Sequence, residues 1–212
     1  AVNDTDFMSS MPPKLTAATG MDALTHAIES YITPGAWVMS DMFELKAIEM
    51  IAAHLKAAVD NGNDTAAREA MSQAQYIAGM GFSNVGLGIV HSMAHPLGAH
   101  YDTPHGVANA LLLPYVMEYN AESPAAPKYM QIAKAMGVNT EGMTEAEGVR
   151  AAVDAVRQLS LSIGIPQKLH EIGVREEDLH QLAIDAFNDV CTGGNPRPTS
   201  VEDIEALYRK AF

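Results

Sequence analysis

Apolar residues in this 212-residue chain recur at steps of three and four positions, which is the spacing of one face of an α-helix. The stretch 41–58 carries the clearest example, a stripe formed by Leu45, Ile48, Ile51 and Leu55. Alternating apolar and polar positions never continue long enough to predict a β-strand. The pattern therefore predicts helices throughout.

Capping residues predict where several of these helices begin and end. Thr144 is followed three positions later by Glu147, a capping box, and Gly164 is placed to end the helix that they start. The stretch 175–190 has acidic residues in its first turn, as the helix dipole favours. Ser200 precedes another acidic turn, and basic residues follow near the end of that segment. We predict helices over 144–164, 175–190 and 200–212.

Loop-forming segments separate the predicted helices: "DNGND", "ESPAAP" and "CTGGNPRP". No internal repeat or domain-sized linker interrupts the chain, so we predict one all-α bundle of about eight or more helices across residues 1–212. The opening "AVNDTDFMSSMPP" is more typical of a linker than of the start of a domain. We therefore expect the sequence to be a fragment or a processed product.

Composition narrows the possible partners and location. The hydrophobic content of 48% is enough for a sizeable core. A formal net charge of −13 disfavours nucleic acid and anionic membrane surfaces as partners. The single Cys191 forms no internal disulfide, and no apolar run reaches the length of a membrane span. We expect a cytoplasmic protein.

Half of the eight histidines lie in one segment, "HSMAHPLGAHYDTPHG", at residues 91–106. His91 and His95 are four positions apart, so a helix over this region places both on one face. Pro96 follows at once, and we expect helical geometry to be interrupted between it and the next helix.

The next helix is predicted to begin with Thr103 as its N-cap and Pro104 as its first residue. His105 then lies at the start of that helix, while His91 lies near the end of the preceding one. Because a short turn brings the facing ends of two helices together, these two imidazoles can converge on one point.

A second pair at the same spacing occurs earlier, where Asp22 and His26 share one helical face. One carboxylate and three imidazoles would form a four-coordinate nitrogen and oxygen site for a divalent metal. Without a thiolate, such a donor set suits iron, zinc, manganese or cobalt and does not select among them. Spacing alone leaves open the alternative that these histidines make ordinary hydrogen bonds or face solvent.

Other candidate chemistry is weaker. The remaining histidines are assigned to the surface or to non-ligand positions: His54, His100, His170 and His180. The segment "GMGFSNVGLG" is not a dinucleotide-binding motif, because Asn84 replaces its last glycine and no predicted strand precedes it. A helical metal-dependent hydrolase and a metal-free interaction module are the alternative functions. The hydrolase is disfavoured because the sequence contains no His-Asp dipeptide.

Three segments resemble the C-terminal helical domain of the iron-containing, group III alcohol dehydrogenases: "PPKLTAATGMDALTHAIESYIT", "GMGFSNVGLGIVHSMAHPLGAHYDTPHGVANALLLPYVMEYN" and "CTGGNPR". The resemblance extends from Met11 to Phe212 and implies a dehydroquinate synthase-like C-terminal fold. It also implies that the metal ligands are Asp22, His26, His91 and His105.

The resemblance assigns further roles and partners. It places His95 beside the nicotinamide as a candidate catalytic and cofactor-binding residue, Leu15 against the cofactor, and Phe82 and Cys191 in the substrate pocket. The implied metal is Fe(II), with Zn possible in the purified protein, and the implied reaction is hydride transfer between NAD and a small alcohol, 1,2-diol or aldehyde. The family's N-terminal dinucleotide-binding domain has no counterpart in the sequence, so we expect the isolated chain to be inactive. Relatives of this kind also suggest a homo-oligomer.

Overall fold

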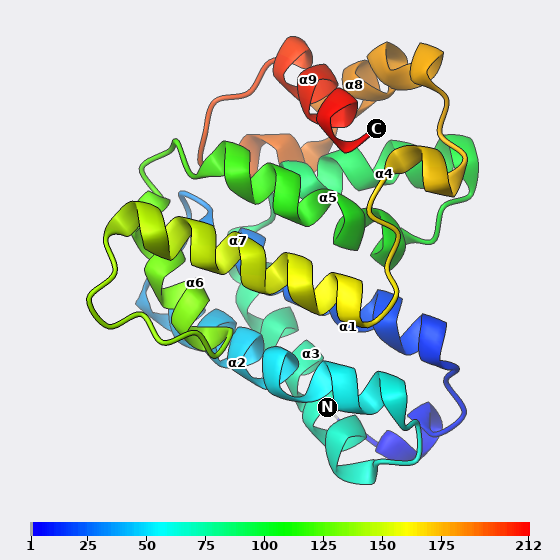
Figure 1. The fold of residues 1–212 in the computed structure, drawn as a ribbon, viewed down its shortest axis with the longest axis vertical. Coiled ribbons are helices and arrows are strands. Elements are labelled where there is room, and N and C mark those ends of the chain that lie inside the picture. Colours follow the sequence, from blue (N-terminus) through cyan, green and yellow to red (C-terminus); the bar gives the residue numbers. More distant parts are fainter. Residues whose placement is uncertain (1) are drawn as a thin grey trace.

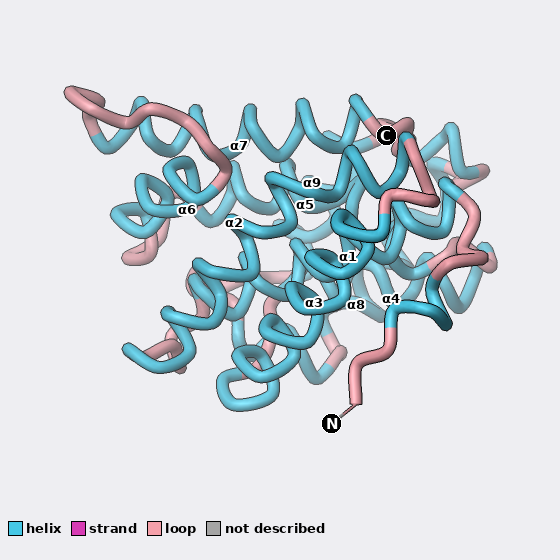
Figure 2. Tube along the Cα trace, turned by 90° about the horizontal axis from the view of Figure 1, so that it is seen from below, coloured by secondary structure: helices cyan, strands magenta, loops and turns pink. Residues whose placement is uncertain are grey.

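The computed structural model describes residues 2–212, and within them it contains α-helices, 3-10 helices and loops but no strand (Figure 2). The α-helices are α1 (Pro13–Ile32), α2 (Val38–Asp60), α3 (Thr65–Val85), α4 (Ile89–Tyr101), α5 (His105–Asn120), α6 (Tyr129–Ala135), α7 (Glu145–Ser162), α8 (Leu179–Phe187) and α9 (Val201–Ala211). The 3-10 helices are η1 (Thr5–Met8), η2 (Ala126–Lys128), η3 (Leu169–Ile172), η4 (Glu176–Asp178) and η5 (Val190–Gly194). The predicted all-α fold is confirmed.

Helix α1 is the centre of the bundle. It packs against α2, α3 and α5, and most of its residues are buried. Helix α4 packs against α5 and α8, while α6 packs against α7. Along the long axis of the molecule, α8 and α9 lie at one end and α2 and α3 at the other (Figure 1). A site on α1 that faces α4 and α5 therefore lies between the two ends of the bundle.

Gly106 determines how closely α5 approaches α1. A Cβ atom at this position would lie 2.2 Å from the backbone oxygen of Ala18, which is far inside van der Waals contact. Only glycine permits this approach, because it has no side chain to separate the two backbones. The contact brings the first turn of α5, and with it His105, against the face of α1 that carries Asp22.

The helix predictions agree with the structure in kind and differ at some boundaries. Helix α2 extends beyond the predicted 41–58, and three of its four stripe residues are fully buried while Leu45 is partly buried. The capping box predicted at Thr144 is present. Ser200, predicted to precede an acidic first turn, is the N-cap of α9 and also forms a capping box, with Asp203. The predicted helix 175–190 is wrong in extent, because the chain forms η4, then α8, then a turn before η5.

Pro96 does not interrupt its helix as predicted, because α4 continues through it to Tyr101. Proline inside a helix removes one backbone hydrogen bond and costs about 3 kcal/mol. Here Pro96 and Leu97 are both buried, so tertiary packing holds this turn helical despite that cost. The helix ends instead at Asp102, whose backbone is left-handed with φ of 52°.

The start of the next helix is displaced by one residue from the prediction. Pro104 is the N-cap of α5, with an extended ψ of 128°, and Thr103 makes no capping bond. The predicted position of His105 at the helix start is confirmed, since it is the first residue of α5. Among residues 2–212, none of the helices is both long enough and apolar enough to cross a lipid bilayer.

Candidate metal centre

Helix α1 supplies the first two donors of the candidate site. Asp22 and His26 are one turn apart and partly buried, and the Nδ1 atom of His26 lies 2.8 Å from the backbone oxygen of Asp22. Since a carbonyl oxygen only accepts, Nδ1 carries the proton and donates this bond. The Nε2 atom of His26 is therefore the one with a lone pair available for a metal.

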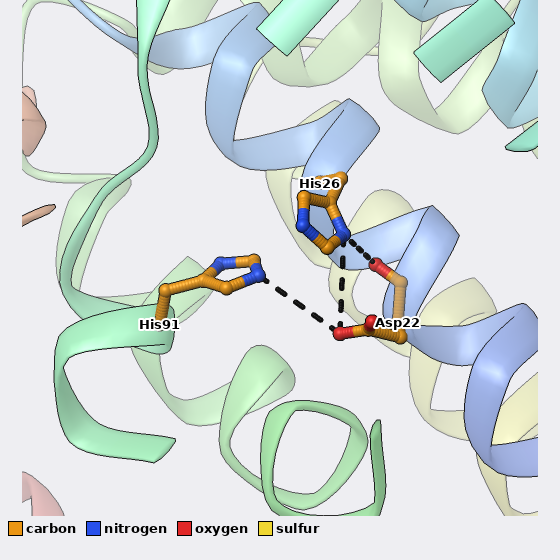
Figure 3. Close-up of side chains that lie close together, drawn as sticks. All are labelled: Asp22, His26 and His91. Carbon is orange, nitrogen blue, oxygen red and sulfur yellow. Dashed lines mark hydrogen bonds and ion pairs between the residues drawn. The ribbon is translucent and has the colours of Figure 1, made fainter. Parts of the chain in front are cut away.

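Helix α4 contributes His91, which is 1% exposed. Its Nε2 atom is buried without a hydrogen-bond partner among the described residues and lies 3.9 Å from Oδ1 of Asp22 (Figure 3). The rings of His26 and His91 are 4.3 Å apart between centroids. An unpartnered buried nitrogen beside a carboxylate is the arrangement expected of a metal ligand.

The other nitrogen of His91 is held by a residue that the sequence analysis did not identify. Glu29 is 2% exposed, and its Oε2 atom lies 2.5 Å from Nδ1 of His91. Its Oε1 atom accepts a hydrogen bond of 2.7 Å from the backbone N–H of Val90. Metal-bound histidines in proteins commonly donate to such a carboxylate. The signal in the sequence was an acidic residue three positions after His26 on the same helix.

Helix α5 brings His105 to the edge of this cluster. Its Nε2 atom is 3.5 Å from Oδ1 of Asp22, and its ring is 5.4 Å from that of His91. Asn109, one turn further along α5, donates to Oδ1 of Asp22 over 2.6 Å and lies 3.0 Å from Nε2 of His105. This amide links the α1 donor to the α5 donor and was also missed by the sequence analysis.

Burial favours the neutral form of two of these imidazoles. It lowers the pKa of His26, and the neighbouring His91 lowers it further, against the opposing effect of Asp22. Burial likewise lowers the pKa of His105, although Asp22 acts in the other direction. A neutral imidazole is the form that binds a metal, so both shifts prepare the site for a cation.

The geometry fits a divalent metal. One ligand atom from each of Asp22, His26 and His91 can be chosen so that all lie within 4.8 Å of one another. His105 stands outside that mutually close group and contacts it through Asp22. One carboxylate and three imidazoles suit iron, zinc, manganese or cobalt, as the sequence had indicated.

A cavity of about 490 Å³ opens beside the cluster between α1, α3 and the segment before α1. Asp22, His26 and Phe82 lie in its wall, and the Phe82 ring is 4.4 Å from that of His26. Cys191 is not among the described residues that line this cavity, and burial raises the pKa of its thiol to about 12. Leu15 is 46% exposed and lies two helical turns before Asp22, on the same face of α1.

His95 lies on the solvent side of the cluster. It is exposed, its ring is stacked 5.4 Å from that of His105, and its Nδ1 atom lies 2.7 Å from Oδ2 of Asp189. Burial alone would raise the pKa of Asp189, but hydrogen bonds from the Cys191 backbone and from His95 lower it overall. Asp189 therefore accepts a hydrogen bond from the Nδ1–H of His95, and the Nε2 lone pair of His95 remains available.

The remaining histidines lie away from the cluster. His170 and His180 are exposed as predicted, whereas His54, also predicted at the surface, is partly buried on α2. His100, predicted only to be a non-ligand, is exposed. The glycine-rich segment rejected as a dinucleotide motif spans the end of α3, and a helix rather than a strand precedes its last glycines. That rejection is confirmed.

An all-helical fold with an Asp–His cluster between α1, α4 and α5 is the class of domain in which a metal site is expected. Residues 16–212 match the model of the Fe-containing alcohol dehydrogenase family, C-terminal. The chain therefore belongs to the iron-containing alcohol dehydrogenase family.

Several members of this family are similar to the chain over nearly its whole length. The chain is 58% identical over 209 residues to lactaldehyde reductase of Escherichia coli K12, covering 99% of this chain and 54% of that protein. It is 45% identical over its full length to 1,3-propanediol dehydrogenase of Citrobacter freundii, covering 54% of that protein. The structure of a 1,3-propanediol oxidoreductase superposes with a TM-score of 0.97 at 45% identity, covering 99% of this chain and 55% of that one.

The structure of an alcohol dehydrogenase from Oenococcus oeni is also similar, with a TM-score of 0.96 at 40% identity, covering 99% of this chain and 54% of the other. The chain thus spans about half the length of the relatives that it matches. All four relatives are reductases, oxidoreductases or dehydrogenases by name, so they do not support the hydrolase alternative.

Proposed function

We propose that residues 1–212 form the metal-binding and substrate domain of an NAD-dependent alcohol dehydrogenase that interconverts a short alcohol or 1,2-diol with its aldehyde. Lactaldehyde and 1,2-propanediol are the substrates that the 58% identity to lactaldehyde reductase favours. The dinucleotide-binding domain corresponds to the half of these relatives that the chain does not span. The isolated chain is therefore expected to bind metal without turning over substrate.

One observation supports this proposal above the others. The Nε2 atom of His91 is buried without a partner and faces Asp22, with His26 and His105 beside it. Leaving such an atom unpaired costs about 1–3 kcal/mol, so an ion that binds it removes a penalty already present in the fold. We assign the four ligands to Asp22, His26, His91 and His105, and the native metal to Fe(II).

The residues around the site have separate tasks. A divalent cation held by these ligands would polarise the oxygen of the alcohol or aldehyde as a Lewis acid. The Phe82 ring gives the adjoining cavity an apolar wall, which suits a small substrate with a carbon chain. His95, oriented by Asp189, is placed to exchange a proton with solvent and to contact the nicotinamide. Leu15 would contact the cofactor, and Cys191 would contribute to the pocket beyond the cavity described above.

The ligand assignment is tested by measuring bound metal. Titration calorimetry with Zn²⁺ or Co²⁺, and with Fe²⁺ under anaerobic conditions, should give one site per wild-type chain. Asp22→Asn and His91→Gln should abolish that site or weaken it by at least 100-fold. The matched control is His180→Gln, because His180 is exposed and pairs with Glu205 away from the cluster. Wild-type chain with no stoichiometric site, or ligand variants that bind like the control, would refute the assignment.

The substrate assignment needs the other half of the enzyme. Fusing the N-terminal half of E. coli lactaldehyde reductase to this chain should restore NADH-dependent reduction of lactaldehyde, and Asp22→Asn should remove that activity. A fusion that binds metal and NADH but reduces none of the short aldehydes would contradict it. A cytoplasmic location, a homo-oligomer and replacement of iron by zinc in purified protein stay predictions.

A further inference from the structure

We infer that Glu29 is a positioning residue that keeps His91 in one tautomer, with its proton on Nδ1, so that the Nε2 lone pair faces the metal site before any ion arrives. The inference rests on the proposed function only in taking His91 as a ligand. The tautomer itself is a property of the metal-free chain.

The hydrogen bonds of Glu29 establish which partner donates. Its Oε1 atom accepts from the backbone N–H of Val90 at 2.7 Å, and its Oε2 atom accepts from the backbone N–H of His91 at 3.4 Å. Both oxygens therefore act as acceptors of backbone N–H groups. The Nδ1 atom of His91, 2.5 Å from Oε2, must be a third donor.

The surroundings of Nε2 favour the same tautomer. That atom has no acceptor within hydrogen-bond distance, since Oδ1 of Asp22 is 3.9 Å away. A proton on Nε2 would be a buried N–H without an acceptor, while Nδ1 would present a lone pair to the Glu29 carboxylate. The Nδ1–H tautomer avoids both problems.

The backbone at Gly88 gives Glu29 the room to do this. A Cβ atom on Gly88 would lie 2.8 Å from Oε1 of Glu29, so a larger residue would displace the carboxylate from the start of α4. Gly88 is the N-cap of α4 and makes no side-chain capping bond. Glu29, from α1, thus supplies the cap of α4 and orients the ligand that α4 carries.

Glu29→Gln separates these two tasks, because an amide has only one acceptor oxygen. If that oxygen faces Val90, the amide N–H₂ faces Nδ1 of His91, and the ring relieves this clash by moving its proton to Nε2. If the oxygen faces His91 instead, the N–H₂ opposes the Val90 N–H. We expect the first arrangement, because the ring can exchange its proton and the backbone cannot.

The direct test is the tautomer of His91 in the metal-free chain. Long-range ¹H–¹⁵N correlation of the imidazole nitrogens, with His91 assigned by the loss of its signals in His91→Asn, should show the proton on Nδ1. Glu29→Gln should move it to Nε2 and weaken Zn²⁺ or Co²⁺ binding by about 10–100-fold, as loss of the partner of a ligand does elsewhere. Glu29→Asp, which keeps the carboxylate, should restore part of the affinity.

The control is Thr144→Ala, which removes a helix cap on α7 far along the chain from the site. It should lower stability without changing the metal affinity. Wild-type His91 with its proton on Nε2 overturns the inference, whatever the stability of Glu29→Gln. Glu29→Gln that is destabilised like Thr144→Ala but keeps the wild-type tautomer and affinity also overturns it, since Glu29 would then be only a cap. Absence of metal binding by the wild-type chain would refute the proposed function and leave the tautomer result standing.

Discussion

Glu44 is a buried carboxyl group in α2, and replacing it with glutamine should change how the stability of the protein depends on pH. The side chain is 0% exposed, and neither carboxyl oxygen has a hydrogen-bond partner among the described residues. Its carboxyl group packs against α3 at Gly81, where a Cβ atom would lie 1.9 Å from Oε1. Burial, reinforced by the nearby Asp41, raises the pKa of Glu44 from 4.5 to about 8.

The raised pKa of Glu44 determines how the stability of the folded chain changes with pH. The folded chain holds the Glu44 proton more tightly than the unfolded chain, so the stability that this group contributes is lost as pH rises from about 4.5 to about 8. Linkage between protonation and folding converts the two pKa values into a loss of about 3 kcal/mol between pH 5 and pH 8. Glu44→Gln keeps the size and polarity of the side chain but cannot ionise, so it should not suffer this loss.

The assay is urea unfolding of both proteins at several pH values, followed by circular dichroism, in buffer without metal. The free energy of unfolding of Glu44→Gln minus that of wild type should increase by about 3 kcal/mol from pH 5 to pH 8. All other groups titrate alike in the two proteins, so the difference isolates Glu44. Glu49→Gln, an exposed position on the same helix, should change the difference by less than about 0.5 kcal/mol. Parallel curves for Glu44→Gln and wild type would refute the reasoning.

Three other perturbations test separate parts of the structure. Gly106→Val should drive α5 away from the Ala18 backbone, which should lower the free energy of unfolding by about 2–3 kcal/mol and weaken metal binding through His105. Wild-type metal affinity in this variant would show that the close approach of α5 to α1 is not needed for the site. Arg68→Leu should lower the free energy of unfolding in urea by about 3 kcal/mol, because the buried guanidinium donates hydrogen bonds to two backbone carbonyls and a threonine hydroxyl. A decrease below about 1 kcal/mol would show that these hydrogen bonds are dispensable. Since burial lowers the pKa of His26 and His105, calorimetric Zn²⁺ affinity should stay nearly constant down to about pH 6.5 and fall below it. A fall that begins near pH 8 would argue against neutral imidazoles at pH 7.

The parts of the fold that local sequence determines were predictable. The capping box at Thr144 is contained within four residues and forms as expected. The helix predicted to follow Ser200 also begins there, with Ser200 as its N-cap. Pro96 was misjudged because its effect depends on tertiary packing: Pro96 and Leu97 are both buried, and that burial holds the helix together. Local sequence determines which secondary structure a segment prefers, and contacts with residues distant in the sequence determine whether the segment adopts it.

The candidate site shows the same division. The i,i+4 spacing of Asp22 and His26 placed both on one face of α1, and the structure brings them to His91 as anticipated. Glu29 and Asn109 could not be found in this way, because their partners lie 62 and 87 positions away along the chain. Such pairs become visible only when the packing of α1 against α4 and α5 is known.

Because the candidate donors are distributed over α1, α4 and α5, a cation bound by them would be a ligand of the native state alone. An unfolded chain cannot hold Asp22 and His91 within a few ångströms, since they are 69 positions apart in the sequence. Bound metal should therefore add RT ln(1 + [L]/Kd) to the free energy of unfolding, about 2.7 kcal/mol at a hundredfold excess over Kd. Melting temperatures of this protein are then comparable only at a stated free metal concentration, and a chelator in the buffer should act as a mild denaturant.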